Sequence, residues 1–64
     1  MDDVLRKRAK GYRLRAEEAR TAADNMRTPE TRETLRRIAD GYDLLADMME
    51  RRAARTPARE TPTG

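Results

Sequence analysis

The sequence predicts an all-α protein, an antiparallel two-helix hairpin that dimerises into a four-helix bundle. Two observations predict the hairpin: small and apolar residues recur at helical spacing in two long segments, and a Thr-Pro pair separates these segments. A third observation predicts the dimer: the second segment is apolar over a wider arc than one neighbouring helix covers.

The first helix is expected over about residues 3–26. Apolar or small residues recur there at alternating intervals of four and three, which is the heptad spacing of packed helices. Asp2 and Asp3 precede them and suit the positive N-terminal end of a helix. The recurring residues are Leu5, Ala9, Tyr12, Ala16, Ala19, Ala23 and Met26.

The second helix is expected over about residues 29–54, after a turn at about 27–28. Thr28 is a favourable N-cap, and Pro29 suits the first helical position. A connection this short makes the two helices antiparallel neighbours. The same heptad spacing continues at Leu35, Ala39, Tyr42, Ala46, Met49 and Ala53. We call the two sets together the hairpin seam.

The C-terminal segment, residues 55–64, is expected to be a disordered tail. Pro57 cannot continue the helix, and the segment has no apolar residue large enough to pack.

The two helical segments resemble each other. When residue n is aligned with residue n+30, seven of the twelve positions from Leu5 to Ala16 match, in the phrase LR-x-x-A-x-GY-x-L-x-A. A duplicated helical unit would give the hairpin an approximate two-fold axis. A chance match in a sequence of few residue types is the alternative.

The predicted dimer interface lies outside the hairpin seam. At 100° per residue, the apolar arc of the second helix extends to about 220°, and its remaining side is charged. A helix with so wide an arc needs a second neighbour. Each Gly-Tyr glycine stands at the edge of the seam, where a small residue allows another helix to approach closely. The interface is expected to contain Gly11, Leu14, Ile38, Gly41, Leu44, Leu45 and Met48.

Composition excludes several function classes. The chain has no Cys, His or Ser, which removes disulfides and the commonest nucleophiles, general bases and zinc ligands. Asp40, Asp43 and Asp47 share a helix face, but arginines stand near them, so we interpret them as a solvated surface. We expect no enzyme activity, no metal and no cofactor. No segment has the apolar length of a membrane span, and we expect a cytoplasmic protein.

A basic stretch in the first helix raises an alternative function. RKRAKGYRLR holds six cations in ten residues, and a dimeric hairpin of this length is similar in architecture to Rop, the plasmid RNA-binding four-helix bundle. The hairpin also places this stretch beside the acids of the second helix, so mutual pairing is the competing interpretation. The candidate nucleic-acid patch is Arg6, Lys7, Arg8, Lys10, Arg13 and Arg15.

The segment from Tyr12 to Glu50, about three-fifths of the chain, contains the pattern RAEEAR…A…M…PETR…L…IA…Y…LA. In this it resembles a group of short bacterial proteins of uncharacterised function, so the resemblance implies no activity and no site residues. The prediction from the residues is a small protein-interaction module or accessory subunit. It would act by self-association, with a dimer favoured, and by docking to a larger protein.

Overall fold

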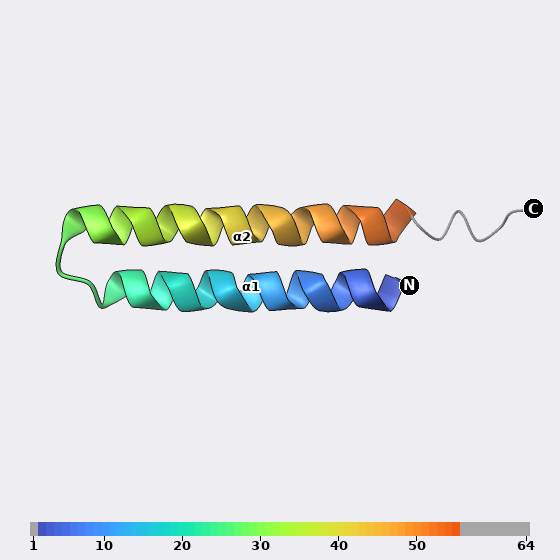
Figure 1. Ribbon diagram of the computed structural model, residues 1–64, viewed down its shortest axis with the longest axis horizontal. Helices are drawn as coiled ribbons and strands as arrows, with labels where there is room; N and C mark the ends of the chain where they lie inside the picture. The colour runs from blue at the N-terminus through green and yellow to red at the C-terminus, as the bar shows by residue number, and fades with distance from the viewer. Residues whose placement is uncertain (1, 56–64) are drawn as a thin grey trace, which may run out of the picture.

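The computed structural model describes residues 2–55, which form two antiparallel helices lying side by side (Figure 1). Helix α1 spans Asp2–Asp24 and helix α2 spans Pro29–Arg55. The described part of the chain contains no strand. The predicted all-α hairpin is therefore confirmed. Of the tail expected at 55–64, Arg55 ends α2 and the remainder lies outside the described residues.

Helix α1 ends at Asp24, two residues before the end that the periodicity predicts. The backbone N–H of Asn25 donates to the carbonyl oxygens of both Thr21 and Ala22, at 3.2 and 3.1 Å. The next N–H, that of Met26, reaches only the carbonyl of Ala23, at 3.1 Å. The bonding pattern thus tightens from four residues to three at this point, as is common where a helix ends.

The connection between the helices is held by α2. The first helical hydrogen bond of α2 runs from the Arg32 N–H to the Thr28 carbonyl at 3.0 Å, which is consistent with Thr28 preceding a helix that starts at Pro29. The Arg32 Nε also donates to the carbonyl of Met26 at 2.8 Å. This bond satisfies a backbone acceptor of the connection between the helices, a role not expected for Arg32 from the sequence.

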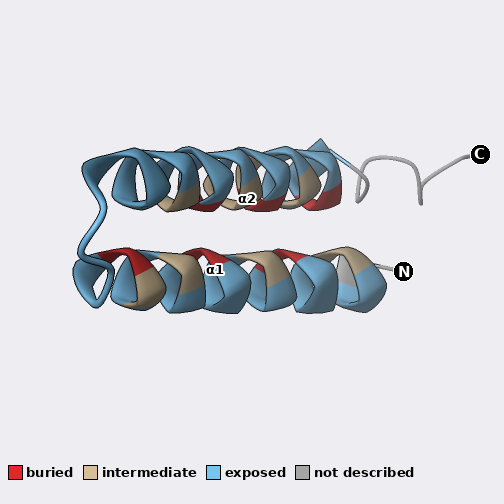
Figure 2. Cartoon of the chain, turned by 60° about the vertical axis from the view of Figure 1, so that its left-hand side comes forward, coloured by how far each residue is buried: buried red, intermediate tan, exposed pale blue. Residues whose placement is uncertain are grey.

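The fully buried residues of the described chain are all alanines. They recur every seven residues on both helices, and Figure 2 shows that the buried stretches face each other. Alanine at the contact lets two helix backbones approach closely, but each methyl group buries little apolar area. These residues are Ala9, Ala16 and Ala23 of α1 and Ala39, Ala46 and Ala53 of α2, each at most 1% exposed.

The larger residues of the hairpin seam border this alanine contact. Tyr12 and Tyr42 are half-buried and stack on each other, with ring centroids 6.1 Å apart and ring planes 24° apart. Leu5, Leu35 and Met49 are also half-buried. Met26, which the heptad pattern placed at the end of the seam, lies beyond α1 and is 37% exposed. Among the described residues, the single hairpin therefore fully buries no side chain larger than a methyl group.

Candidate interaction surface

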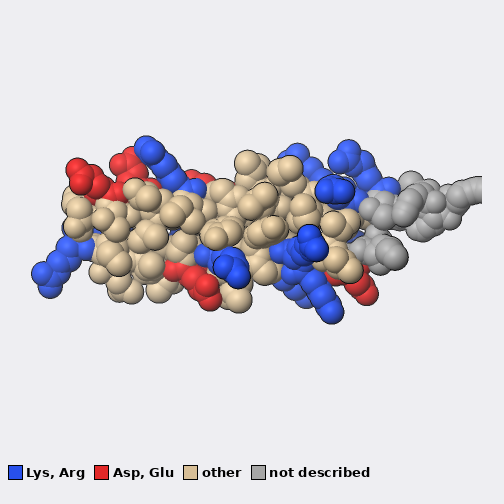
Figure 3. Space-filling view, in the orientation of Figure 1, with Lys and Arg blue, Asp and Glu red and all other residues tan. Residues whose placement is uncertain are grey.

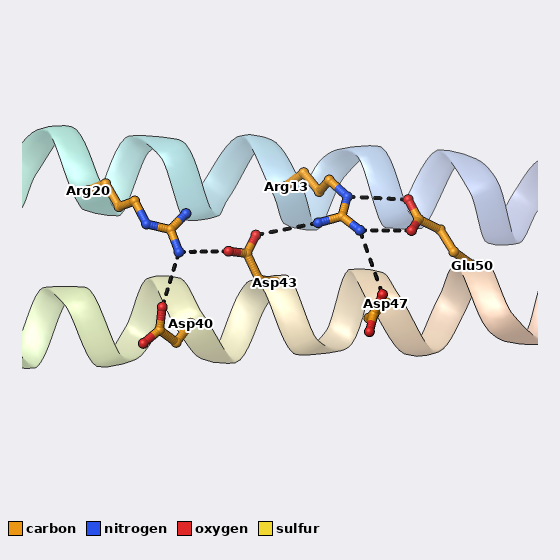
Figure 4. Close-up of polar contacts among 6 residues, drawn as sticks. All are labelled: Arg13, Arg20, Asp40, Asp43, Asp47 and Glu50. Carbon is orange, nitrogen blue, oxygen red and sulfur yellow. Dashed lines mark hydrogen bonds and ion pairs between the residues drawn. The ribbon is translucent and has the colours of Figure 1, made fainter.

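One edge of the hairpin carries a network of ion pairs centred on Arg13 (Figure 4). The Arg13 guanidinium donates two hydrogen bonds to the Glu50 carboxylate, with Nε–Oε2 at 3.2 Å and Nη2–Oε1 at 2.7 Å. Asp43 and Asp47 lie at 3.7 and 3.9 Å from the same guanidinium. A two-point contact of this kind fixes the direction of both side chains, so it helps to set the register of α1 against α2.

Arg20 continues the same network one heptad further along α1. Its Nη2 lies 3.1 Å from an Asp40 oxygen and 2.6 Å from an Asp43 oxygen. The expected partners of these acids are the cations before Ala16, a stretch that does not include Arg20. The spacing of the two arginines could have identified Arg20, because it follows Arg13 by seven residues and therefore repeats the same heptad position.

The Arg13–Glu50 contact shifts the pKa of both partners. The hydrogen bond from Arg13, aided by the positive charges of Arg13 and Arg6, lowers the pKa of the Glu50 carboxyl below its ordinary value. The same bond raises the pKa of Arg13, and the hydrogen bond to Asp43 raises that of Arg20. Both arginines and Glu50 are therefore charged at neutral pH.

Stability should fall in acid through Glu50. Its pKa is lower in the folded chain than in the unfolded one, so its contribution is complete above about pH 4.3 and is lost as pH falls through the folded value. Helix content followed by circular dichroism during urea unfolding, at pH 7 and pH 3, checks this. Glu50→Gln should lose less stability between the two pH values than the parent chain. Glu17→Gln, a control at a residue with no ion pair among residues 2–55, should behave like the parent.

The aspartates of this edge are paired with arginines. Residues 2–55 contain no group of three or more carboxylates placed to hold a metal ion. Asp40 and Asp43 instead accept hydrogen bonds from Arg20, and Asp47 accepts one from Arg51 at 3.0 Å. A cation would have to displace guanidinium groups that already neutralise these oxygens.

The six cations of the candidate nucleic-acid patch do not share one face. Arg13 is held by three acids of α2. Arg6, Lys7 and Lys10 border a shallow hollow together with Asp3. The remaining two, Arg8 and Arg15, are exposed. They are seven residues apart and flank the hairpin seam, on the opposite side from Arg13. Arg6, Lys10 and Arg13 are spaced at i, i+4 and i+7 and so share one side of α1, whereas Arg8 and Arg15 lie on another side.

The other edge of α2 carries a second line of apolar residues. Ile38 is 45% exposed, Leu45 37% and Met48 47%. With Gly41 between them they follow one another at intervals of three, four and three, which is again heptad spacing. We call Ile38, Gly41, Leu45 and Met48 the outer stripe. Leu44, 60% exposed, lies beside it.

Figure 3 draws one face of the hairpin in space-filling form, with charged and uncharged residues in different colours. On the face drawn there, uncharged residues run along the middle of the hairpin, and the charged side chains stand mostly at its margins. No residue of the outer stripe is buried by α1. A line of apolar side chains on α2 is therefore left partly exposed in the single chain.

Helix α1 presents a different surface at the equivalent positions. Gly11 and Leu14 repeat Gly41 and Leu44, and Leu14 is 56% exposed. However, Arg8 and Arg15 stand where α2 has Ile38 and Leu45. The two predicted interface residues of α1 therefore do not belong to a continuous apolar line. Val4, 53% exposed, is a further apolar residue that the sequence reasoning did not select.

The two helical glycines have open space around them. A Cβ atom built on Gly11 or Gly41 would meet no other group within 4 Å. A glycine inside a helix costs roughly 0.5–1 kcal/mol relative to alanine. The packing of α1 on α2 therefore gives no reason for either glycine.

Comparison of the chain with protein-family models, curated proteins and solved structures found no match. Neither α1 nor α2 is long and apolar enough to cross a membrane.

Proposed function

We propose that this protein is a small non-enzymatic interaction module that self-associates, two hairpins forming a four-helix bundle. The observation that carries the proposal is the outer stripe of α2, a second heptad line that lies uncovered beside Leu44. Burial of such a line against another helix is the ordinary way in which coiled-coil and bundle helices associate.

The small core of the hairpin supports the same conclusion. Its fully buried residues are alanines, and its larger seam residues are only half-buried. A two-helix unit of this kind gains little from burial to offset the entropy of ordering its backbone. In an assembly, Ile38, Leu45 and Met48 are removed from water, as large apolar side chains are in the core of a larger domain. Their burial stabilises the helices and the assembly together.

The charged edge is consistent with a structural role. Its arginines and carboxylates bind one another across the hairpin. These groups therefore offer no free acid and base that could act together on a bound molecule. A self-associated hairpin of this kind could serve as an accessory subunit that docks to a larger protein in the cytoplasm, and a pull-down of the intact chain from its native cell addresses that role.

The proposal predicts a molar mass of twice 7.4 kDa for the chain at micromolar concentration, measured by size-exclusion chromatography with light scattering. Leu44→Asp/Met48→Asp places two charges on the uncovered face of α2 and should give a monomer of 7.4 kDa with reduced helix content. Leu14→Asp, at the equivalent exposed site of α1, is the matched control and should remain dimeric. A monomeric parent chain, or a double variant that dimerises like the parent, contradicts the proposal.

A further inference from the structure

One face of the N-terminal half of α1 combines exposed apolar residues with cations. Its two large apolar residues are each more than half exposed. Its members follow one another at spacings of three and four residues, which places them on one side of a helix. No acidic residue occurs between Val4 and Ala16. We call this set the outer face of α1: Val4, Lys7, Arg8, Gly11, Leu14 and Arg15.

The cations of the outer face are not neutralised within the hairpin. Among residues 2–55, its one lysine and two arginines form no ion pair. The opposite edge of α1 differs, because Arg13 is held there by three acids of α2. Arg13 and, more weakly, Arg6 also lower the pKa of the Glu50 carboxyl on that edge. The positive charge that remains available therefore lies on the side that also exposes the two apolar residues.

The same end of the hairpin holds most of the positive charge. Antiparallel helices place residues 2–15 beside residues 44–55, and these two segments hold nine Lys and Arg against four Asp and Glu. Residues 16–43 hold five against seven. On the face drawn in Figure 3, Lys and Arg side chains are most numerous toward the end at which α1 begins. An anionic partner is therefore attracted to this end.

We propose that the outer face of α1 binds the surface of a membrane that contains anionic lipid. Lipid headgroups supply the negative charge that the cations attract, and the acyl boundary beneath them accepts apolar side chains. Lysine and arginine suit this position, because their aliphatic stems lie along apolar surroundings while their charged ends reach the phosphates. In this arrangement α1 lies along the plane of the headgroups and does not cross the membrane.

A lipid surface fits this face better than a protein helix or a nucleic acid does. A partner helix packs against a continuous apolar line, whereas Gly11 and cations separate the two apolar residues of the outer face. A nucleic acid takes its affinity from contacts to phosphate, so exposed valine and leucine among the cations add little to it. A membrane requires no fixed register and accepts apolar and cationic side chains side by side.

Sedimentation with vesicles measures the proposed binding. Vesicles of phosphatidylcholine with about one-third phosphatidylserine carry the charge of an anionic leaflet, and vesicles of pure phosphatidylcholine lack it. The parent chain should bind the first at least about tenfold more tightly, and added salt should release it. Arg15→Gln should weaken binding about fivefold, which is the contribution of one cation near such a surface. Arg27→Gln changes an exposed arginine outside the face and should bind like the parent.

Leu14→Gln separates a lipid surface from a partner that is only charged, since it removes an apolar side chain and leaves the net charge unchanged. Vesicle binding should weaken about fivefold. Met26→Gln is the control, because it makes a similar change at an exposed apolar residue at the other end of the hairpin, and it should bind like the parent.

Three results would overturn the proposal. The first is a parent chain that does not prefer anionic vesicles at low salt. The second is a Leu14→Gln or Arg15→Gln variant that binds them as tightly as the parent. The third is a parent chain that binds a DNA or RNA duplex and not the vesicles.

The outcomes also separate this inference from the proposed function, because the outer face of α1 and the outer stripe of α2 are different surfaces. Both face variants should keep the molar mass of the parent in light scattering. A parent chain that dimerises without binding vesicles overturns the membrane inference and leaves self-association intact. A monomeric parent that binds anionic vesicles does the reverse.

Discussion

Replacing Ala46 by leucine is expected to lower the free energy of unfolding by about 1–3 kcal/mol. Ala46 is 0% exposed, at the middle of the α2 alanine series that contacts α1. Because alanine sets a short distance between the helices, three additional carbon atoms have no space unless the helices separate. Their separation would pull apart the stacked tyrosines and lengthen the Arg13–Glu50 hydrogen bonds.

Urea unfolding followed by circular dichroism, at one fixed protein concentration, measures this effect. Ala54→Leu is the matched control, because Ala54 is an exposed alanine of the same helix and the change in side chain is identical. The control should lie within about 0.5 kcal/mol of the parent, as surface substitutions usually do. Equal stability of the two leucine variants would contradict the close alanine contact described above.

Replacing Gly41 by leucine is expected to raise helix content while weakening the dimer at least tenfold. The substitution removes a mid-helix glycine, which favours the helix by about 0.8–1 kcal/mol. The hairpin itself has space for the new side chain. In the proposed dimer, however, the new leucine would stand within the outer stripe, where the second copy packs, and such overpacking destabilises an interface.

Gly11→Leu is the matched control for this second prediction, since it makes the same change at the repeat position of α1. It should raise helix content by a similar amount and leave the dimer unchanged. Circular dichroism reports the helix content, and light scattering across a concentration series reports the dissociation constant. If Gly41→Leu leaves the dimer as strong as Gly11→Leu does, Gly41 has no role in assembly.

Much of the fold follows from the sequence because helix formation is local. The spacing of Ala9, Ala16 and their neighbours shows which face of each helix is apolar, and the Thr28–Pro29 pair shows where the chain turns. The apolar face of α2 was also predictable, since Leu44, Leu45 and Met48 are consecutive or nearly so and cannot all point to one neighbour.

The tertiary structure decided how deeply each seam residue is buried and which charges meet. The periodicity of the sequence places Ala16 and Tyr12 on the same face of the helix, yet Ala16 is fully buried and Tyr12 only half-buried. The difference arises because the burial of each residue depends on the distance between the two helices. The smallest side chains of both helices set that distance, and the pattern of one helix alone does not contain it. The same is true of Arg20: its acids lie about twenty residues away, and only the register of α1 against α2 brings them within 3.1 Å.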